Sequence, residues 1–153
     1  MEEKFILFSP EWIHEAIKTV QGARSKDMEF RKLTSGYSLS LAYIITDLPP
    51  KLRDLYGNDQ ITLFIRLDKG MVRDFKVLTE KPIEKTDFTI TSTYPIAKQI
   101  FLGQLSIAAA FIDRQIKVEP LDVMYRKPRF TAKSIIVANK IVKLCQQIPT
   151  EYA

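Results

Sequence analysis

The central part of the chain alternates hydrophobic and polar residues with a period of two, a pattern typical of half-buried β-strands. The alternation runs over residues 37–45 and returns over residues 61–67. An Asp-Lys-Gly sequence at residues 68–70 predicts a tight turn, because glycine readily takes the left-handed conformation. Residues 71–78 are then expected to return as a third strand, and residues 88–90 to lie in a fourth. The pattern predicts a mostly antiparallel sheet.

Helical periodicity marks both ends of the chain. Serine followed by proline at residues 9–10 predicts a helix start, because serine accepts hydrogen bonds from free amides and proline is tolerated at the first helical position. We expect this helix over residues 9–22, with Gly22 as its end. A last helix is expected over residues 131–147, with apolar residues on one half and lysines on the other. The order of elements predicts a single α+β domain over residues 1–153, with helices over one face of the sheet.

Residues 87–119 combine strands and helices in close succession. The stretch begins as a strand, turns into an amphipathic helix at residues 93–95, breaks at Gly103 and continues as an almost wholly apolar segment over residues 105–112. A short strand at residues 115–119 follows, and then a turn. Helices placed between two strands offer a wide apolar surface, which indicates a lipid-sized pocket rather than a reaction centre.

Composition sets the class of protein that we expect. Hydrophobic residues make up 46% and charged residues 27% of the chain, as in an ordinary globular domain. No apolar run approaches the roughly 18 residues of a membrane span, and the acids near the N-terminus differ from a secretory signal. Cys145 is a single cysteine, so no internal disulfide is expected. We therefore expect a cytoplasmic protein.

The positive charge of the chain is concentrated at its C-terminal end. The formal net charge is +5, and residues 123–150 contain several cations but no aspartate or glutamate. The lysines have three interpretations: a solvated helix face, a contact with an anionic membrane surface or ligand headgroup, or a contact with nucleic acid. Ile136 among the bases favours the membrane. Because no recognition motif is present, we expect no nucleic-acid partner.

Catalytic chemistry finds little support in the sequence. His14 falls on the polar face of its helix, and Cys145 falls on an apolar face where a thiol behaves as a small hydrophobe. No phosphate-binding, nucleophile or metal-ligand motif is present, so we predict no catalytic residue, no cofactor and no metal. An enzyme acting on a lipid or thioester would need a polar group facing the pocket, and the candidates are Tyr43, Asp87 and Tyr94.

Several short motifs resemble the sterol carrier protein type-2 family of lipid-binding domains. Residues 86–90 (Thr-Asp-Phe-Thr-Ile) resemble its acidic strand entry, and residues 103–105 (Gly-Gln-Leu) with 110–111 (Ala-Phe) resemble its glycine-leucine break and alanine-rich second helix. Residues 116–118 (Ile-Lys-Val) resemble the short strand after it, and residues 68–70 its central hairpin. The resemblance covers roughly residues 8–144.

The resemblance implies a five-stranded sheet with helices that enclose an apolar tunnel, covered by the C-terminal helix. It also implies non-enzymatic binding of fatty acids, fatty acyl-coenzyme A, phospholipids or sterols, and their movement between membranes. The predicted headgroup or membrane contacts are Lys133, Lys140 and Lys143. The predicted tunnel lining consists of Phe101, Leu105, Phe111, Ile112, Ile116, Val137 and Ile141.

An alternative is the same fold with a filled core, serving as an accessory or dimerisation module, for example as a homodimer. The small residues Gly103 and Ala108 to Ala110 fit both alternatives. They permit close packing of a helix against a sheet, and they also leave room for an acyl chain beside larger side chains. Both alternatives stay open from the sequence.

Overall fold

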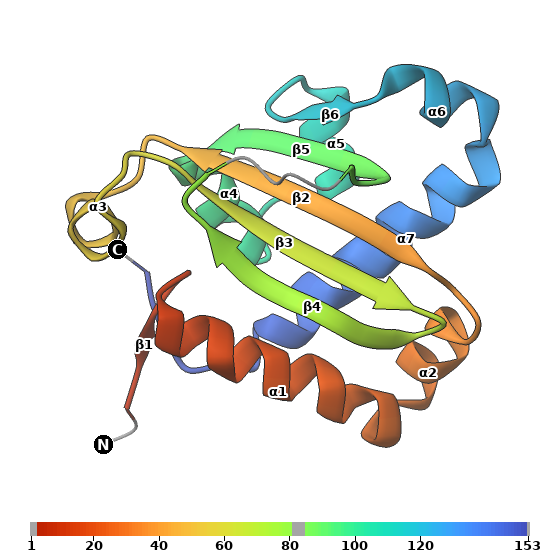
Figure 1. Ribbon diagram of the computed structural model, residues 1–153, viewed down its shortest axis with the longest axis horizontal. Helices are drawn as coiled ribbons and strands as arrows, with labels where there is room; N and C mark the ends of the chain where they lie inside the picture. Colours follow the sequence, from red (N-terminus) through yellow and green to blue (C-terminus); the bar gives the residue numbers. More distant parts are fainter. Residues whose placement is uncertain (1–2, 81–84, 153) are drawn as a thin grey trace.

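The computed structural model describes residues 3–80 and 85–152, and within them a five-stranded sheet forms the centre of the molecule. The strand order is β4-β3-β2-β5-β6. The β2–β5 pair is parallel, and the other neighbouring pairs are antiparallel. The strands are β2 (Leu39–Thr46), β3 (Ile61–Asp68), β4 (Met71–Leu78), β5 (Phe88–Thr93) and β6 (Lys117–Glu119) (Figure 1).

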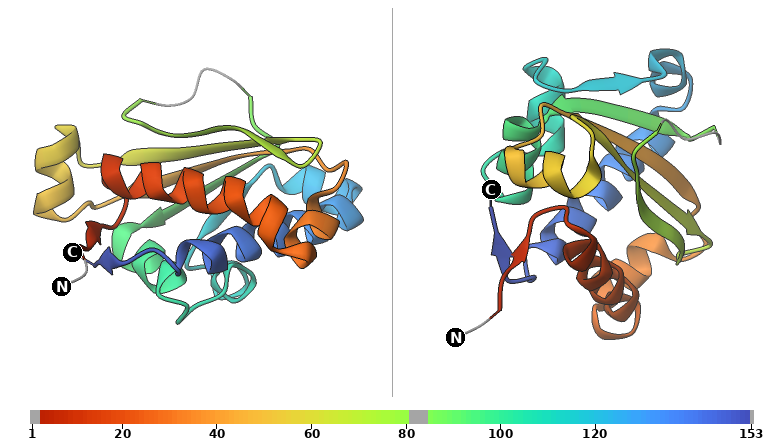
Figure 2. Two further views of the ribbon diagram at one scale, coloured as in Figure 1. Left: turned by 90° about the horizontal axis from the view of Figure 1, so that it is seen from below. Right: turned by 60° about the vertical axis from the view of Figure 1, so that its left-hand side comes forward.

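Helices cover one face of this sheet, with α1, α4, α5 and α7 all on the same side (Figure 2). A two-stranded parallel pair joins β1 (Phe5–Ile6), which precedes α1, to β7 (Thr150–Glu151), which follows α7. The predicted single α+β domain with a five-stranded, mostly antiparallel sheet is confirmed. The helices are α1 (Pro10–Lys26), α2 (Met28–Thr34), α3 (Pro50–Tyr56), α4 (Tyr94–Phe101), α5 (Ile107–Ile112), α6 (Leu121–Arg126) and α7 (Pro128–Cys145).

The helix ends differ from the predicted ones. The prediction that Gly22 ends the first helix is wrong, because α1 continues to Lys26 and buries Ala23 against the core. Asp27 then ends α1 and begins α2: its backbone N–H donates to the Ala23 carbonyl oxygen, and its carboxylate accepts from the Phe30 N–H. The turn expected after residue 120 is the helix α6, and α7 begins at Pro128, earlier than expected.

The turn between β3 and β4 forms at the Asp-Lys-Gly sequence, as predicted. Lys69 and Gly70 both have left-handed backbones, with φ of 50° and 84°. A Cβ atom on Gly70 would lie 2.6 Å from the carbonyl oxygen of Thr34, a distance that side chains do not tolerate. Glycine is therefore required here both by the turn and by the close approach of α2.

An aromatic cluster anchors α1 and α4 to each other. The rings of Phe8, Trp12 and Phe101 meet edge to face, with centroids 5.0–5.7 Å apart, and Phe8 also contacts Tyr94. The indole N–H of Trp12 donates to Thr150 Oγ1 at 3.0 Å, which ties the cluster to β7. Phe101 therefore belongs to a filled part of the core, formed by segments far apart in sequence.

Candidate functional site

An apolar cavity lies between one end of the sheet and the helices α5, α6 and α7. Counting the open space at its mouth, it encloses about 410 Å³. Its lining combines strand positions, α7 positions and side chains from the short helices. The lining residues are Leu41, Phe88, Ile90, Ile107, Phe111, Val118, Met124, Thr131, Ser134, Ile135 and Ala138.

Most of the lining comes from one face of the sheet and one face of α7, and the spacing of residues along each element places these side chains together. On the sheet, Leu41 lies opposite Phe88 across the β2–β5 pair, and Ile90 lies opposite Val118 across the β5–β6 pair. Residues directly opposite on neighbouring strands present their side chains to the same face. On α7, the lining residues within 131–138 follow the spacing of one helix face. The cavity thus lies where the helix face and the sheet face do not fully close on each other.

The polar atoms of the lining are already hydrogen-bonded within the protein. Thr131 Oγ1 donates to the Lys127 carbonyl oxygen at 2.9 Å. Ser134 Oγ donates to the Phe130 carbonyl oxygen at 2.7 Å and is hydrogen-bonded to the Tyr37 hydroxyl group. The cavity therefore offers apolar surface to a guest and no spare polar group, which suits a hydrocarbon chain.

The cavity is small in this conformation. The volume open to the centre of a water-sized sphere is about 30 Å³, enough for about two water molecules. A lipid chain would therefore need side chains of the wall to move. Met124 has a flexible, unbranched side chain, and its helix α6 buries none of its residues. A movement of the α6 wall would therefore expose no fully buried side chain of that helix.

The predicted tunnel residues fall in different places. Phe111 lies in the cavity wall. Ile112 is 76% exposed, because it points away from the core at the end of α5, and Leu105 is partly buried at the edge of the core. The others are buried in the core outside the cavity lining, namely Phe101, Ile116, Val137 and Ile141.

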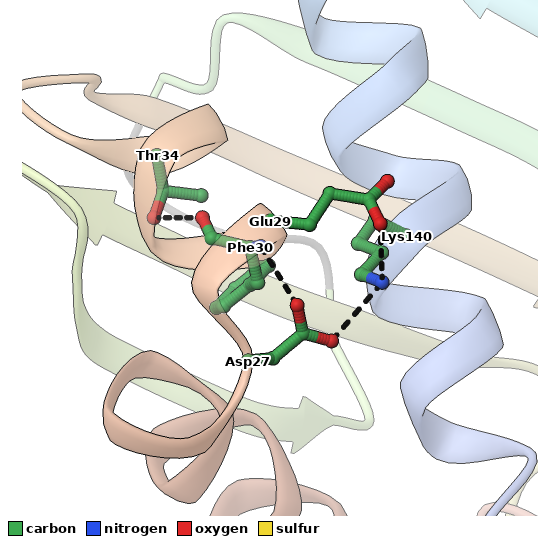
Figure 3. A network of polar contacts seen from close by, with 5 residues as sticks. All are labelled: Asp27, Glu29, Phe30, Thr34 and Lys140. Atoms are coloured by element: carbon green, nitrogen blue, oxygen red, sulfur yellow. Dashed lines mark hydrogen bonds and ion pairs between the residues drawn. The ribbon is translucent and has the colours of Figure 1, made fainter.

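The predicted headgroup lysines also differ from one another. Lys140 Nζ lies 3.1 Å from Asp27 and 3.7 Å from Glu29, so that it joins α7 to α2 (Figure 3). The Phe30 N–H and Lys140 lower the pKa of Asp27, and the hydrogen bond to Asp27 raises the pKa of Lys140. Lys133 Nζ lies over the Tyr37 ring, 4.7 Å from its centroid. Lys143 is exposed on the outer face of α7.

A second, polar hollow adjoins the cavity. Its volume open to the centre of a water-sized sphere is about 410 Å³, against about 30 Å³ for the cavity, and the hollow is open to solvent. We call it the basic groove, because cations from two chain segments lie in its wall. The residues that line it are Lys85, Thr86, Asp87, Pro120, Asp122, Val123, Arg126, Lys127 and Phe130.

The side chains considered above for a catalytic role, Tyr94 among them, are absent from the lining of the cavity. Burial raises the pKa of Cys145 to about 12 and that of Tyr43 to about 12, so neither ionises readily. The Tyr43 hydroxyl is hydrogen-bonded to Ser92 Oγ at 2.7 Å, and Asp87 lies in the basic groove. His14 is exposed.

Two further kinds of feature are absent from residues 3–80 and 85–152. No group of histidine, cysteine and carboxylate side chains there is arranged to hold a metal ion. No helix in the same residues is long and apolar enough to cross a membrane.

Comparison with solved structures identifies the fold. The chain is similar to the solution structure of a conserved hypothetical protein from Thermus thermophilus, described as possibly a sterol carrier protein, with TM-score 0.70 and 16% identity over 97% of this chain and 94% of that one. A crystal structure of sterol carrier protein 2 matches with TM-score 0.68 and 17% identity, over 93% and 98% of the two chains. Sterol carrier protein 2 from Yarrowia lipolytica, in its apo form, matches with TM-score 0.51 and 13% identity, over 89% and 88%.

Sequence comparisons add no closer relative. No protein-family model matches the chain, and no curated protein matches it. The structural likeness covers nearly the whole chain, so the sterol carrier protein 2-like fold that the sequence motifs predict is confirmed.

Proposed function

We propose that the protein binds a lipid non-covalently, with the hydrocarbon part of the lipid in the apolar cavity. The observation that carries this proposal is the lining of the cavity, in which Thr131 and Ser134 have their hydroxyl groups engaged by the protein. A guest there gains from the removal of apolar surface from water and needs no directional contact. The fold, which is that of proteins described as sterol carriers, supports the same class of ligand.

If the cavity widens, the burial of a hydrocarbon chain would release more free energy than association costs. Burying about ten methylene groups would contribute about 8 kcal/mol, at about 0.8 kcal/mol each. Association costs at least about 4 kcal/mol of this, and wall movement costs more. We therefore expect moderate affinity for a fatty acid, fatty acyl-coenzyme A, phospholipid or sterol-like ligand, with Met124 and α6 moving to admit it.

Carriage rather than catalysis is the activity that we propose. Release of the lipid at a membrane would let the protein move it between membranes. In that case Lys133, Lys140 and Lys143, with Ile136 between them, are the predicted contacts with an anionic membrane surface or a lipid headgroup. Of the three lysines, Lys143 is exposed on the outer helix face, whereas Lys140 is bound to Asp27.

The test is the analysis of lipid carried by the purified protein. The protein is extracted with organic solvent, the extract is analysed by mass spectrometry, and the delipidated protein is titrated with a fluorescent fatty acid. We expect a co-purified lipid and saturable binding of one probe per chain. The absence of both a bound lipid and saturable probe binding would refute the proposal.

A second candidate is an accessory or dimerisation module of the same fold. The small size of the cavity, about 30 Å³ for water-sized spheres, is the observation that favours it. This candidate predicts a stable dimer by light scattering and no lipid in the extract. A monomer that carries lipid would exclude it.

A further inference from the structure

The basic groove and the apolar cavity share their walls. The chain passes from one lining to the other between neighbouring residues: Asp87, Val123 and Phe130 face the groove, whereas the residue after each of them faces the cavity. In Figure 1 the start of β5, the helix α6 and the start of α7 lie together at one end of the molecule. The two hollows are therefore neighbours along three separate segments of the chain.

A pair of stacked aromatic rings separates the two hollows. Phe88 lines the cavity and Phe130 lines the groove, and their ring centroids are 5.7 Å apart with an angle of 22° between the planes. Phe130 is only partly buried, so its ring is the more accessible of the two. These two rings therefore place the lining of the apolar space in contact with the lining of the polar space.

The charges of the groove leave two lysines available. Asp122 is paired with Arg126 at 2.9 Å, and the Asp87 carboxylate accepts a hydrogen bond from the Ser40 N–H at 2.9 Å. In the described part of the chain, Lys85 has no ion-pair partner, and Lys127 lies over the Phe130 ring, 6.0 Å from its centroid. Counting all five charged side chains of the wall, three are cationic and two are anionic. The balance favours an anion.

We propose that the basic groove is the headgroup subsite of the lipid site, and that it accepts the phosphate group of a single-chain lipid. This proposal rests on the proposed function, since the chain of the same lipid would occupy the apolar cavity. Lys85 and Lys127 would contact the phosphate oxygens, because ammonium groups donate strong hydrogen bonds to ionised oxygens. The Phe130 ring would turn aside where the chain joins the headgroup.

The experiment compares ligands that share one chain and differ in the headgroup. Dodecyl phosphate, dodecanol and inorganic phosphate each compete with a bound fluorescent fatty acid, for the wild-type protein and for a variant with Lys85→Gln and Lys127→Gln. The control is Lys32→Gln, which removes an exposed charge from α2 outside both hollows. Circular dichroism confirms that each variant is folded.

We expect dodecyl phosphate to bind at least about tenfold more tightly than dodecanol, equal to about 1.4 kcal/mol. In the double variant this advantage should disappear while the affinity for dodecanol is unchanged, and Lys32→Gln should keep the wild-type values. An equal affinity for the two ligands, or an advantage that survives in the double variant, would overturn the headgroup subsite. Displacement by inorganic phosphate as strong as that by dodecyl phosphate would also overturn it, because the hydrocarbon chain would then add nothing to binding.

Failure of the proposed function looks different, because then neither dodecanol nor dodecyl phosphate would bind at all. The role of Phe130 has its own readout. Phe130→Leu keeps an apolar side chain but removes the stacked ring, so dodecyl phosphate should associate faster in stopped-flow measurements. An unchanged association rate would exclude Phe130 from the path of the ligand.

Discussion

Replacing Ala138 by leucine tests whether the cavity is empty and whether it is the lipid-binding site. Ala138 lies on α7, is 8% exposed and lines the cavity. Leucine adds three carbon atoms, which would contribute at most about 2.4 kcal/mol if they filled the void, at about 0.8 kcal/mol each. Incomplete fit reduces this gain, and filled cavities commonly stabilise by about 0.5–2 kcal/mol. The melting temperature should rise by about 2–4 °C per kcal/mol for a chain of this size.

The same substitution should weaken lipid binding, because the new side chain takes the space of the hydrocarbon chain. Ala132→Leu is the matched control, since Ala132 is exposed on the same helix. Thermal unfolding and titration with a fluorescent fatty acid are measured for both variants. A loss of about 1–3 kcal/mol in Ala138→Leu, the usual cost of overpacking, would show that the space is already filled. Lipid binding as strong as in Ala132→Leu would place the site elsewhere.

Three further predictions concern single residues. Gly70→Ala should lower the unfolding free energy by at least about 1 kcal/mol in urea titrations, because its left-handed backbone disfavours a side chain and the new Cβ would lie 2.6 Å from the Thr34 carbonyl oxygen; wild-type stability would contradict the close approach. Asp27→Asn keeps a helix cap but removes the charge that faces Lys140. The pKa of Asp27 in the folded protein is lowered from 3.8, so its charge stabilises the fold above about pH 3.8 and this stabilisation is lost as the pH falls through the lowered pKa. The wild type should therefore be more stable than Asp27→Asn at neutral pH and equally stable in strong acid. A difference that persists in strong acid would contradict the ion pair. Burial raises the pKa of Cys145 to about 12, so the folded protein should contain much less thiolate at neutral pH than a protein with an exposed thiol. Cys145 should therefore react with iodoacetamide only after unfolding; rapid labelling of the native protein would contradict its burial.

The strands were predictable because their alternation is local. Residues 39–46 and 61–68 form β2 and β3 where the period-two pattern predicts them, and the Asp-Lys-Gly turn follows. The parallel β2–β5 pair was not predictable in the same way, since it joins strands far apart in the sequence. Gly22 illustrates the converse: a local stop signal is overridden because the next turn of α1 packs on the core.

The sequence predicted that the candidate site would be an apolar pocket, but it predicted only some of the residues that line the pocket. Phe101 and Phe111 look equivalent in the sequence, but Phe101 packs on Phe8 and Trp12, whereas Phe111 faces the cavity. The segment before α1 fills the space beside Phe101, and no local pattern reveals which distant segment will do so. The cavity residues that the sequence interpretation missed did carry a signal, the helix-face spacing within 131–138 combined with strand alternation.

The charged residues show the same limit. In the sequence, Lys140 falls among the lysines of the polar face of its helix and looks solvated or membrane-facing. In the structure it forms an ion pair with Asp27, the residue that begins α2. The basic groove was also missed, because its cations come from the segment before β5 and from the end of α6 with the residue after it, and two strands and two helices separate these segments in the sequence. Ion pairs and grooves of this kind depend on which elements meet in space.

The most direct test of the central claim is a measurement of where a bound fatty acid lies. Isotope-labelled palmitate is added to protein with labelled isoleucine methyl groups, and intermolecular nuclear Overhauser effects are recorded. The cavity account predicts contacts from the acyl chain to Ile90, Ile107 and Ile135. Contacts confined to isoleucines outside the cavity lining, such as Ile116 and Ile141, or no binding of palmitate at all, would contradict it.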